Sequence, residues 1–142
     1  MNINELINMY DFNNKTAIVT GGTGVLGGEI AGALAGCGAN VAIIDLNTNL
    51  TPDMKSKLDK SSGNVDIFKG NVLDKDSMQK VIEKIAESFG EIDFLINTAG
   101  GNHPQATTST DLSFFNIPLD AFNKVLSLNL MGTILPSQVT GK

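Results

Sequence analysis

The sequence predicts an α/β protein with a doubly wound parallel sheet that is covered by helices on both faces. Short apolar runs recur along the 142 residues, and strands that are buried on both faces have this composition. Helical patterns separate the runs, and this alternation is typical of right-handed crossovers between parallel strands. We expect a helical extension over residues 1–12 and one partial domain over residues 13–142.

The N-terminal extension is expected to form a short helix that docks on the body of the domain. Its apolar residues Ile3, Leu6, Ile7 and Tyr10 share one helical face.

Four strands are expected, because four runs rich in Val and Ile end in polar residues or glycines. They cover residues 15–20, 40–45, 65–69 and 92–97. Four strands are few for such a sheet, and each open edge of a buried-type strand is a liability. This keeps open a hypothesis in which the chain pairs its edge with another subunit, as a homo-oligomer.

The helices are expected between and after these strands. Small residues make the first helix, over 24–36, slim enough to lie against a sheet, and Thr51, Pro52 and Asp53 cap a short exposed helix over 55–60. Asp74 caps a longer helix with an apolar inner face, and Pro118 starts the last one, which Gly132 and Pro136 could bend or end. The inner face of the helix that Asp74 caps is expected to carry Met78, Val81, Ile82, Ile85 and Phe89.

The polar loop over 98–117 follows a strand, where long loops are often functional.

Composition narrows the function classes. The net charge is −5 and no cluster of Lys or Arg is present, so we expect neither nucleic acid nor a membrane as a partner. The single Cys37 excludes an internal disulfide, suits a reducing compartment, and is expected to be a small buried packing residue. With no recognisable signal peptide or apolar span, we expect a cytoplasmic protein.

A glycine-rich turn joins the first strand to the first helix, and it is the main candidate site. Gly21 suits a tight turn, Gly24 lets the backbone approach a ligand, and Gly27 lets the helix pack closely on the strand. Exposed N–H groups and the helix dipole favour a diphosphate at this position. Glycine turns also close loops that hold no ligand, and this alternative stays open.

Further candidates follow the other strands, because ligands of such sheets lie beyond the carboxyl ends of the strands. Asp45 could accept hydrogen bonds from an adenosine ribose and would repel a 2′-phosphate, so NAD is favoured over NADP; it could also be an ordinary acid at a strand end. Asn71 and Val72 could flank an adenine. The small residues after Asn97 would leave room for a ribose and a nicotinamide.

These motifs together resemble the short-chain dehydrogenase/reductase family, whose cofactor domain has a Rossmann-type fold. The resemblance covers nearly all of residues 12–141. Within the family, the segments 24–28, 99–104 and 135–138 are similar to the D-mannonate oxidoreductase (fructuronate reductase) type, which implies a small sugar-acid substrate. Asn71 departs from the Asp that is usual in the family, and Thr98 from the usual Asn or Gly. The motifs that carry the resemblance are Thr20-Gly21-x-x-Gly24-x-x-Gly27, Asp45, Asn71-Val72, Asn97-x-Ala99-Gly100 and Asn129.

The resemblance implies a role for each of these positions. The turn over residues 21–27 would hold the diphosphate of NAD, and Asp45 would hold the adenosine ribose. Asn129 would support a proton relay through water to the catalytic lysine. The implied cofactor-binding residues are Gly21, Thr23, Gly24, Val25, Leu26, Gly27, Asp45, Asn71, Val72, Asn97, Ala99 and Gly100.

The catalytic Tyr-x-x-x-Lys pair of the family is absent from this sequence. The only tyrosine, Tyr10, precedes the glycine turn, and Asn14 stands where the lysine would be. The chain ends at Lys142, before the strand that should bring the catalytic serine. We therefore expect the cofactor-binding half of an oxidoreductase, truncated after about four strands and the following helix, and inactive alone.

Two other hypotheses remain open. The chain could be a non-catalytic dinucleotide-binding module or an assembly protein. A nucleotide-sugar epimerase ranks lower as the parent enzyme, although extended members of the family share the glycine spacing. His103, the only histidine, is expected to be solvent-facing or locally hydrogen-bonded, with substrate contact as the alternative.

Overall fold

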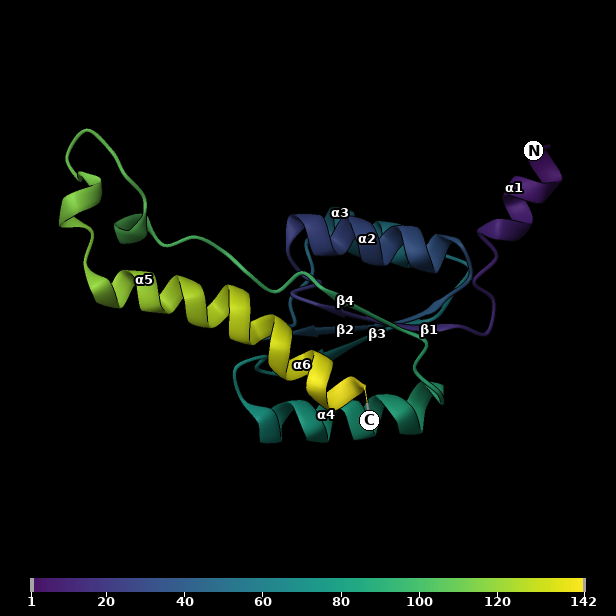
Figure 1. The fold of residues 1–142 in the computed structure, drawn as a ribbon. Coiled ribbons are helices and arrows are strands. Elements are labelled where there is room, and N and C mark those ends of the chain that lie inside the picture. The colour runs from purple at the N-terminus through teal and green to yellow at the C-terminus, as the bar shows by residue number, and fades with distance from the viewer. Residues whose placement is uncertain (1, 142) are drawn as a thin grey trace.

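A computed structural model describes residues 2–141 and confirms the parallel α/β architecture (Figure 1). Four strands form one sheet in the order β3-β2-β1-β4, and every neighbouring pair is parallel. The chain therefore builds outward from β1 to β3 and then crosses back to place β4 on the other side of β1. The strands are β1 (Thr16–Thr20), β2 (Asn40–Asp45), β3 (Val65–Lys69) and β4 (Phe94–Asn97).

Helices cover both faces of the sheet. On one face lie α2 (Val25–Gly36) and α3 (Pro52–Leu58), and on the other lie α4 (Lys75–Phe89) and α6 (Gly132–Thr140) (Figure 1). Successive residues of each strand supply the two cores in turn: Ile43 packs in the core beneath α2, and Ile44 packs in the core above α4. This alternation explains why the central strands are apolar throughout.

The helices α3 and α4 follow their predicted caps. The Thr51 hydroxyl accepts from the Met54 N–H at 3.2 Å, and Asp74 Oδ1 accepts from the Ser77 N–H at 3.0 Å. Helix α3 is less exposed than predicted, because Met54 and Leu58 are buried. Met54 packs where α2 has only Gly28, whose missing Cβ would lie 3.0 Å from the Met54 Cε. On α4, Met78, Val81 and Ile85 are buried as expected, and Ile82 and Phe89 are half-buried.

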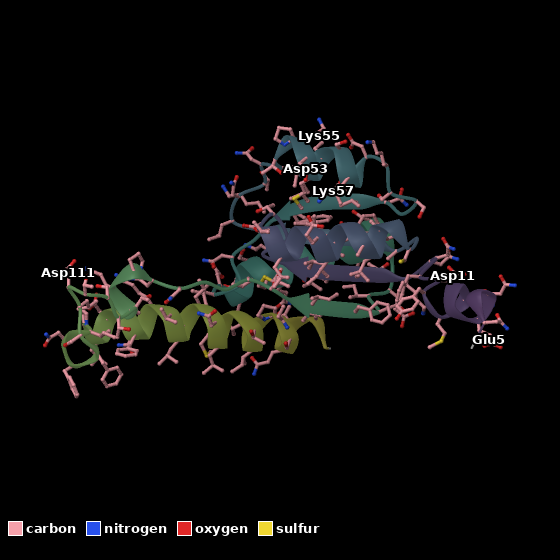
Figure 2. All side chains as sticks on the ribbon, turned by 90° about the horizontal axis from the view of Figure 1, so that it is seen from above. Glu5, Asp11, Asp53, Lys55, Lys57 and Asp111 are labelled. Atoms are coloured by element: carbon pink, nitrogen blue, oxygen red, sulfur yellow. The ribbon has the colours of Figure 1, made fainter. Side chains whose placement is uncertain are left out.

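The N-terminal helix α1 (Ile3–Met9) forms, but its expected docking is wrong. In Figures 1 and 2 it lies away from the sheet, and the Tyr10 side chain after it is 57% exposed. The side chains of Ile3, Leu6 and Ile7 lie outside the described part of the structure. Cys37 also differs from expectation, because it caps the end of α2 and is only half-buried.

Strand β4 begins at Phe94, two residues later than predicted. Asp93 precedes it and acts through its side chain: Oδ2 accepts from the Thr16 N–H at 2.9 Å, and Oδ1 is 2.6 Å from the Lys15 Nζ. This ion pair lowers the pKa of Asp93 and raises the pKa of Lys15, chiefly through the hydrogen bond between the two side chains.

The last helix is continuous, although it changes its winding. It runs through α5 (Leu119–Leu126), a π-helical turn η3 (Ser127–Met131) and α6, so neither Gly132 nor Pro136 ends it. The loop before it contains two 3-10 turns, η1 (Pro104–Ala106) and η2 (Phe114–Asn116). Figure 1 shows this loop and α5 extending beyond the sheet. Among residues 2–141, no helix has the length and apolar character needed to cross a membrane.

Candidate functional site

One pocket of about 560 Å³ lies beyond the carboxyl ends of the strands. The glycine turn forms one wall, and the segments after β2, β3 and β4 form the others. Doubly wound sheets bind their ligands here, beyond the carboxyl ends of the strands and at the point where the strand order reverses. The lining residues are Gly21, Thr23, Gly24, Val25, Leu26, Gly27, Ile44, Asp45, Leu46, Gly70, Val72, Thr98, Ala99, Gly100 and Leu128.

Gly21 begins the turn in a conformation that favours glycine. Its φ is +66°, and a Cβ on it would lie 2.7 Å from the Cα of Ala99. Its N–H donates to the Ile44 carbonyl at 2.7 Å, so the turn is fixed to the end of β2. A side chain at this position would strain the backbone and also displace the segment after β4.

Gly27 provides the close packing that its place in the motif predicts. A Cβ here would lie 2.5 Å from the Thr98 Oγ1 and 2.6 Å from the Gly21 carbonyl oxygen. Thr98 is itself fixed, because its hydroxyl and its N–H both donate to the Thr20 carbonyl. The first turn of α2 therefore rests directly on the ends of β1 and β4.

Gly24 caps the N-terminus of α2 and leaves it open to the pocket. No side chain caps this helix, and no acidic residue occupies its first turn. A Cβ on Gly24 would meet only the Gly21 carbonyl oxygen, at 3.2 Å. The unpaired N–H groups of a first helical turn, together with the helix dipole, favour an anion at such a position. The lining contains no Lys or Arg, so an anion would depend on these backbone groups.

Asp45 lies at the end of β2 and is joined to the glycine turn. Its Oδ2 accepts from the Thr23 hydroxyl at 2.7 Å and from the Thr23 N–H at 3.2 Å, while Oδ1 accepts from the Asn47 N–H at 3.2 Å. Sequence reasoning missed this role of Thr23, which it named only as part of the turn. A hydroxyl in the turn and an acid at the next strand end were the available signals. The remaining lone pairs of the carboxylate are available to a ligand hydroxyl.

Asn71 and Asn97 are the two predicted binding residues that do not line the pocket. Asn71 forms a local turn, in which its Oδ1 accepts from the Leu73 N–H at 3.0 Å. The Asn97 Nδ2 donates to the Ser137 hydroxyl at 3.2 Å, and both residues line a second hollow, of about 340 Å³, beside β4. The Asn97 Oδ1 is buried and has no partner within residues 2–141. Their contacts with a nucleotide stay predictions.

Asn129 connects the last helix to the loop after β4. Its Oδ1 accepts from the Gly101 N–H at 3.1 Å, and its Nδ2 donates to the carbonyls of Gly101 and Val125, both at 2.8 Å. This side chain belongs to the π-helical turn, so the irregular winding coincides with the residue that holds the loop. The amide therefore holds Gly101, which directly follows the pocket-lining Gly100.

His103 has a local role in the structure. Its Nδ1 accepts from the Gln105 N–H at 3.3 Å and caps the turn η1, and the residue does not line the pocket. Within the described chain, no group of His, Cys, Asp and Glu side chains could hold a metal ion.

Comparisons with known proteins agree with this geometry. A family model described as short chain dehydrogenase matches residues 15–140. An oxidoreductase of uncharacterized activity from Haemophilus influenzae is 35% identical over 143 residues, which cover 94% of this chain and 50% of the relative. A D-threitol dehydrogenase from Mycolicibacterium smegmatis is 34% identical, over 94% of this chain and 49% of the relative.

Solved structures give the same result. A protein from Haemophilus influenza assigned as a D-mannonate oxidoreductase, with bound NAD, superimposes with a TM-score of 0.83 at 34% identity. The match covers 96% of this chain and 52% of that one. The chain thus spans about half the length of the relatives that it matches. Because a family model described as short chain dehydrogenase matches residues 15–140, the chain belongs to the short-chain dehydrogenase family.

Proposed function

We propose that the pocket binds NAD(H) and that this chain is the nucleotide-binding half of an oxidoreductase. The observation that carries the proposal is the carboxylate of Asp45, held by Thr23 beside the open N-terminus of α2. Backbone donors for a diphosphate and an acid for a ribose lie in one pocket, and a dinucleotide requires this combination.

NAD is favoured over NADP by charge. A carboxylate at Asp45 accepts hydrogen bonds from ribose hydroxyls, whereas a phosphate on the 2′-hydroxyl would bring two negative groups together. The pocket lining offers no cationic side chain to compensate. The NAD bound in the solved structure from Haemophilus influenza supports the same choice.

The substrate proposed for the whole enzyme is a sugar acid. The support is the likeness of the segment 99–104 to the D-mannonate oxidoreductase type and the assignment of the structural relative. The cofactor would supply or accept a hydride at the substrate carbonyl. The residues of this chain would bind and orient the nucleotide, and Asn129 would hold the loop beside it. Because the Tyr-x-x-x-Lys pair is absent from the sequence, we expect no hydride transfer by these 142 residues alone.

Titration of NADH, followed by the fluorescence of the cofactor, tests the proposal. The chain contains no Trp to interfere with the signal. We expect saturable binding that Asp45→Ala weakens by about tenfold, because hydrogen bonds to a charged group contribute ~1.5 kcal/mol or more. The matched control is Asp111→Ala, which removes an acid from the loop far from the sheet (Figure 2). A folded chain that binds no NADH, or that binds it equally well after Asp45→Ala, would contradict the proposal.

Self-association is a second candidate function. Strand β4 forms an open edge of the sheet, and the exposed fractions of Leu119 and Leu126 on α5 are 74% and 56%. Exposed apolar side chains that gather into a patch mark interaction sites, and an open strand edge can pair with another chain. Sedimentation over a range of concentrations tests whether copies of the chain associate, and a monomer at every concentration would exclude it.

A further inference from the structure

A smaller cavity of about 150 Å³ lies beside the main pocket, between α2 and α3. The two cavities share Thr23, Gly24 and Val25, so the glycine turn separates them. Thr23, whose hydroxyl donates to Asp45, therefore lines both cavities. Its other walls are formed by Gly28, Glu29, Thr51, Asp53, Met54 and Lys57.

Lys57 is the one cationic side chain that lines either of these two cavities, and two acids hold it. Its Nζ is 2.5 Å from the Glu29 Oε1 and 3.3 Å from the Asp53 Oδ2. The hydrogen bonds to Glu29 and then to Asp53 raise the pKa of Lys57. Figure 2 shows Lys57 between α3 and α2, whereas Lys55 lies on the outer side of α3.

We infer that Glu29 and Asp53 form a specificity element, because they withhold Lys57 from the 2′-phosphate of NADP(H). The inference rests on the proposed function and deepens it. If Asp45 binds the adenosine ribose, a phosphate on the 2′-hydroxyl would lie beside Asp45 and Thr23, at the side of the pocket that faces the small cavity. A free lysine there would attract the phosphate. Lys57, Glu29 and Asp53 together instead form a cluster with a net charge of −1, and this cluster repels the phosphate.

The inference separates two contributions to cofactor choice. Asp45 acts directly on the ribose, and its replacement would also weaken NADH. Glu29 and Asp53 act only through charge near the 2′-position, so their replacement should change the affinity for NADPH and leave NADH nearly unaffected. Replacing both acids by amides changes the charge of the cluster from −1 to +1 and keeps the size of the side chains.

The experiment measures dissociation constants for NADH and NADPH by cofactor fluorescence at about 0.15 M salt. In Glu29→Gln/Asp53→Asn we expect NADPH to bind about fivefold more tightly, with NADH changed by less than about twofold. The expected gain in NADPH affinity is small because the charges are exposed and are screened within about 8 Å. Adding Lys57→Met should remove about half of the logarithmic gain, and about 0.5 M salt should remove most of it. Lys55→Met is the matched control and should leave the gain in place.

The outcomes distinguish the inference from the proposed function. Unchanged NADPH affinity in the double variant, with NADH bound normally, refutes the inference alone. A gain that is equally large after Lys57→Met also refutes it, because the released lysine would then contribute nothing. Failure of the unaltered chain to bind either nucleotide refutes the proposed function, and the inference fails with it.

Discussion

Two glycines of α2 are expected to respond in opposite ways to the same substitution. A methyl group on Gly27 would lie 2.5 Å from the Thr98 Oγ1, 2.6 Å from the Gly21 carbonyl oxygen and 2.9 Å from the Gly22 Cα. Two of these three atoms belong to the backbone, and the Thr98 hydroxyl is held by Thr20, so none can move without disturbing the turn. Overpacking of this kind costs about 1–3 kcal/mol.

Gly32 lies in the same helix, but nothing is within 4 Å of the position where its Cβ would be. Alanine is favoured over glycine inside a helix by about 0.5–1 kcal/mol. Gly27→Ala should therefore lower the free energy of unfolding and Gly32→Ala should raise it, so the two variants should differ by about 1.5–4 kcal/mol.

Urea unfolding followed by far-UV circular dichroism measures both variants against the unaltered chain. Equal slopes with urea concentration would show that only stability has changed. NADH titration provides a second measurement, because Gly27→Ala should also displace the turn and weaken binding, whereas Gly32→Ala should not. Wild-type stability in Gly27→Ala would refute the close packing of α2 on the ends of β1 and β4.

Three further substitutions test other contacts. Asp93→Asn should lower the free energy of unfolding at neutral pH relative to the unaltered chain. This difference should vanish in acid, as the pH falls from near the ordinary pKa of 3.8 through the lowered pKa of Asp93 in the folded state. Unfolding curves at several pH values check this. Asn129→Ala should cost about 1 kcal/mol and speed hydrogen exchange in the loop 98–117, because it removes three hydrogen bonds to backbone groups; unchanged exchange would contradict the anchoring role. Thr51→Ala should cost about 1 kcal/mol through loss of a cap, measured by urea unfolding against Thr51→Ser, which keeps the hydroxyl.

Much of the fold could be predicted because the strands are buried on both faces. Strand β2 matches its predicted bounds, Asn40–Asp45, since its apolar run ends in polar residues on both sides. Helix α4 could be predicted equally well, because its fifteen residues show a clear apolar period between an Asp cap and a glycine at the end. Short elements were harder: α3 has too few residues for Met54 and Leu58 to establish a pattern.

The end of the chain could not be predicted for a different reason. Gly132 and Pro136 lower helix propensity, and propensity alone suggested that the helix would bend or end there. Contacts with the rest of the domain override it: a Cβ on Gly132 would lie 3.1 Å from the Val72 Cγ2, and Pro136 is fully buried. The π-helical turn before them holds Asn129 against Gly101, which is distant in sequence. Such winding depends on tertiary contacts that no local pattern contains.

The position of a residue at a strand end does not by itself show which cavity its side chain lines. Asp45 and Asn97 both end a strand at the same edge of the sheet, and both were assigned to the nucleotide for that reason. Side chains alternate along a strand, however, so Asp45 shares the face of Ile43, beneath α2, and meets Thr23. Asn97 shares the face of Leu95, which packs in the other core, and meets Ser137 on α6. Placing a strand-end side chain in a ligand site therefore requires its face as well as its end, and the face follows only from the helix that covers it.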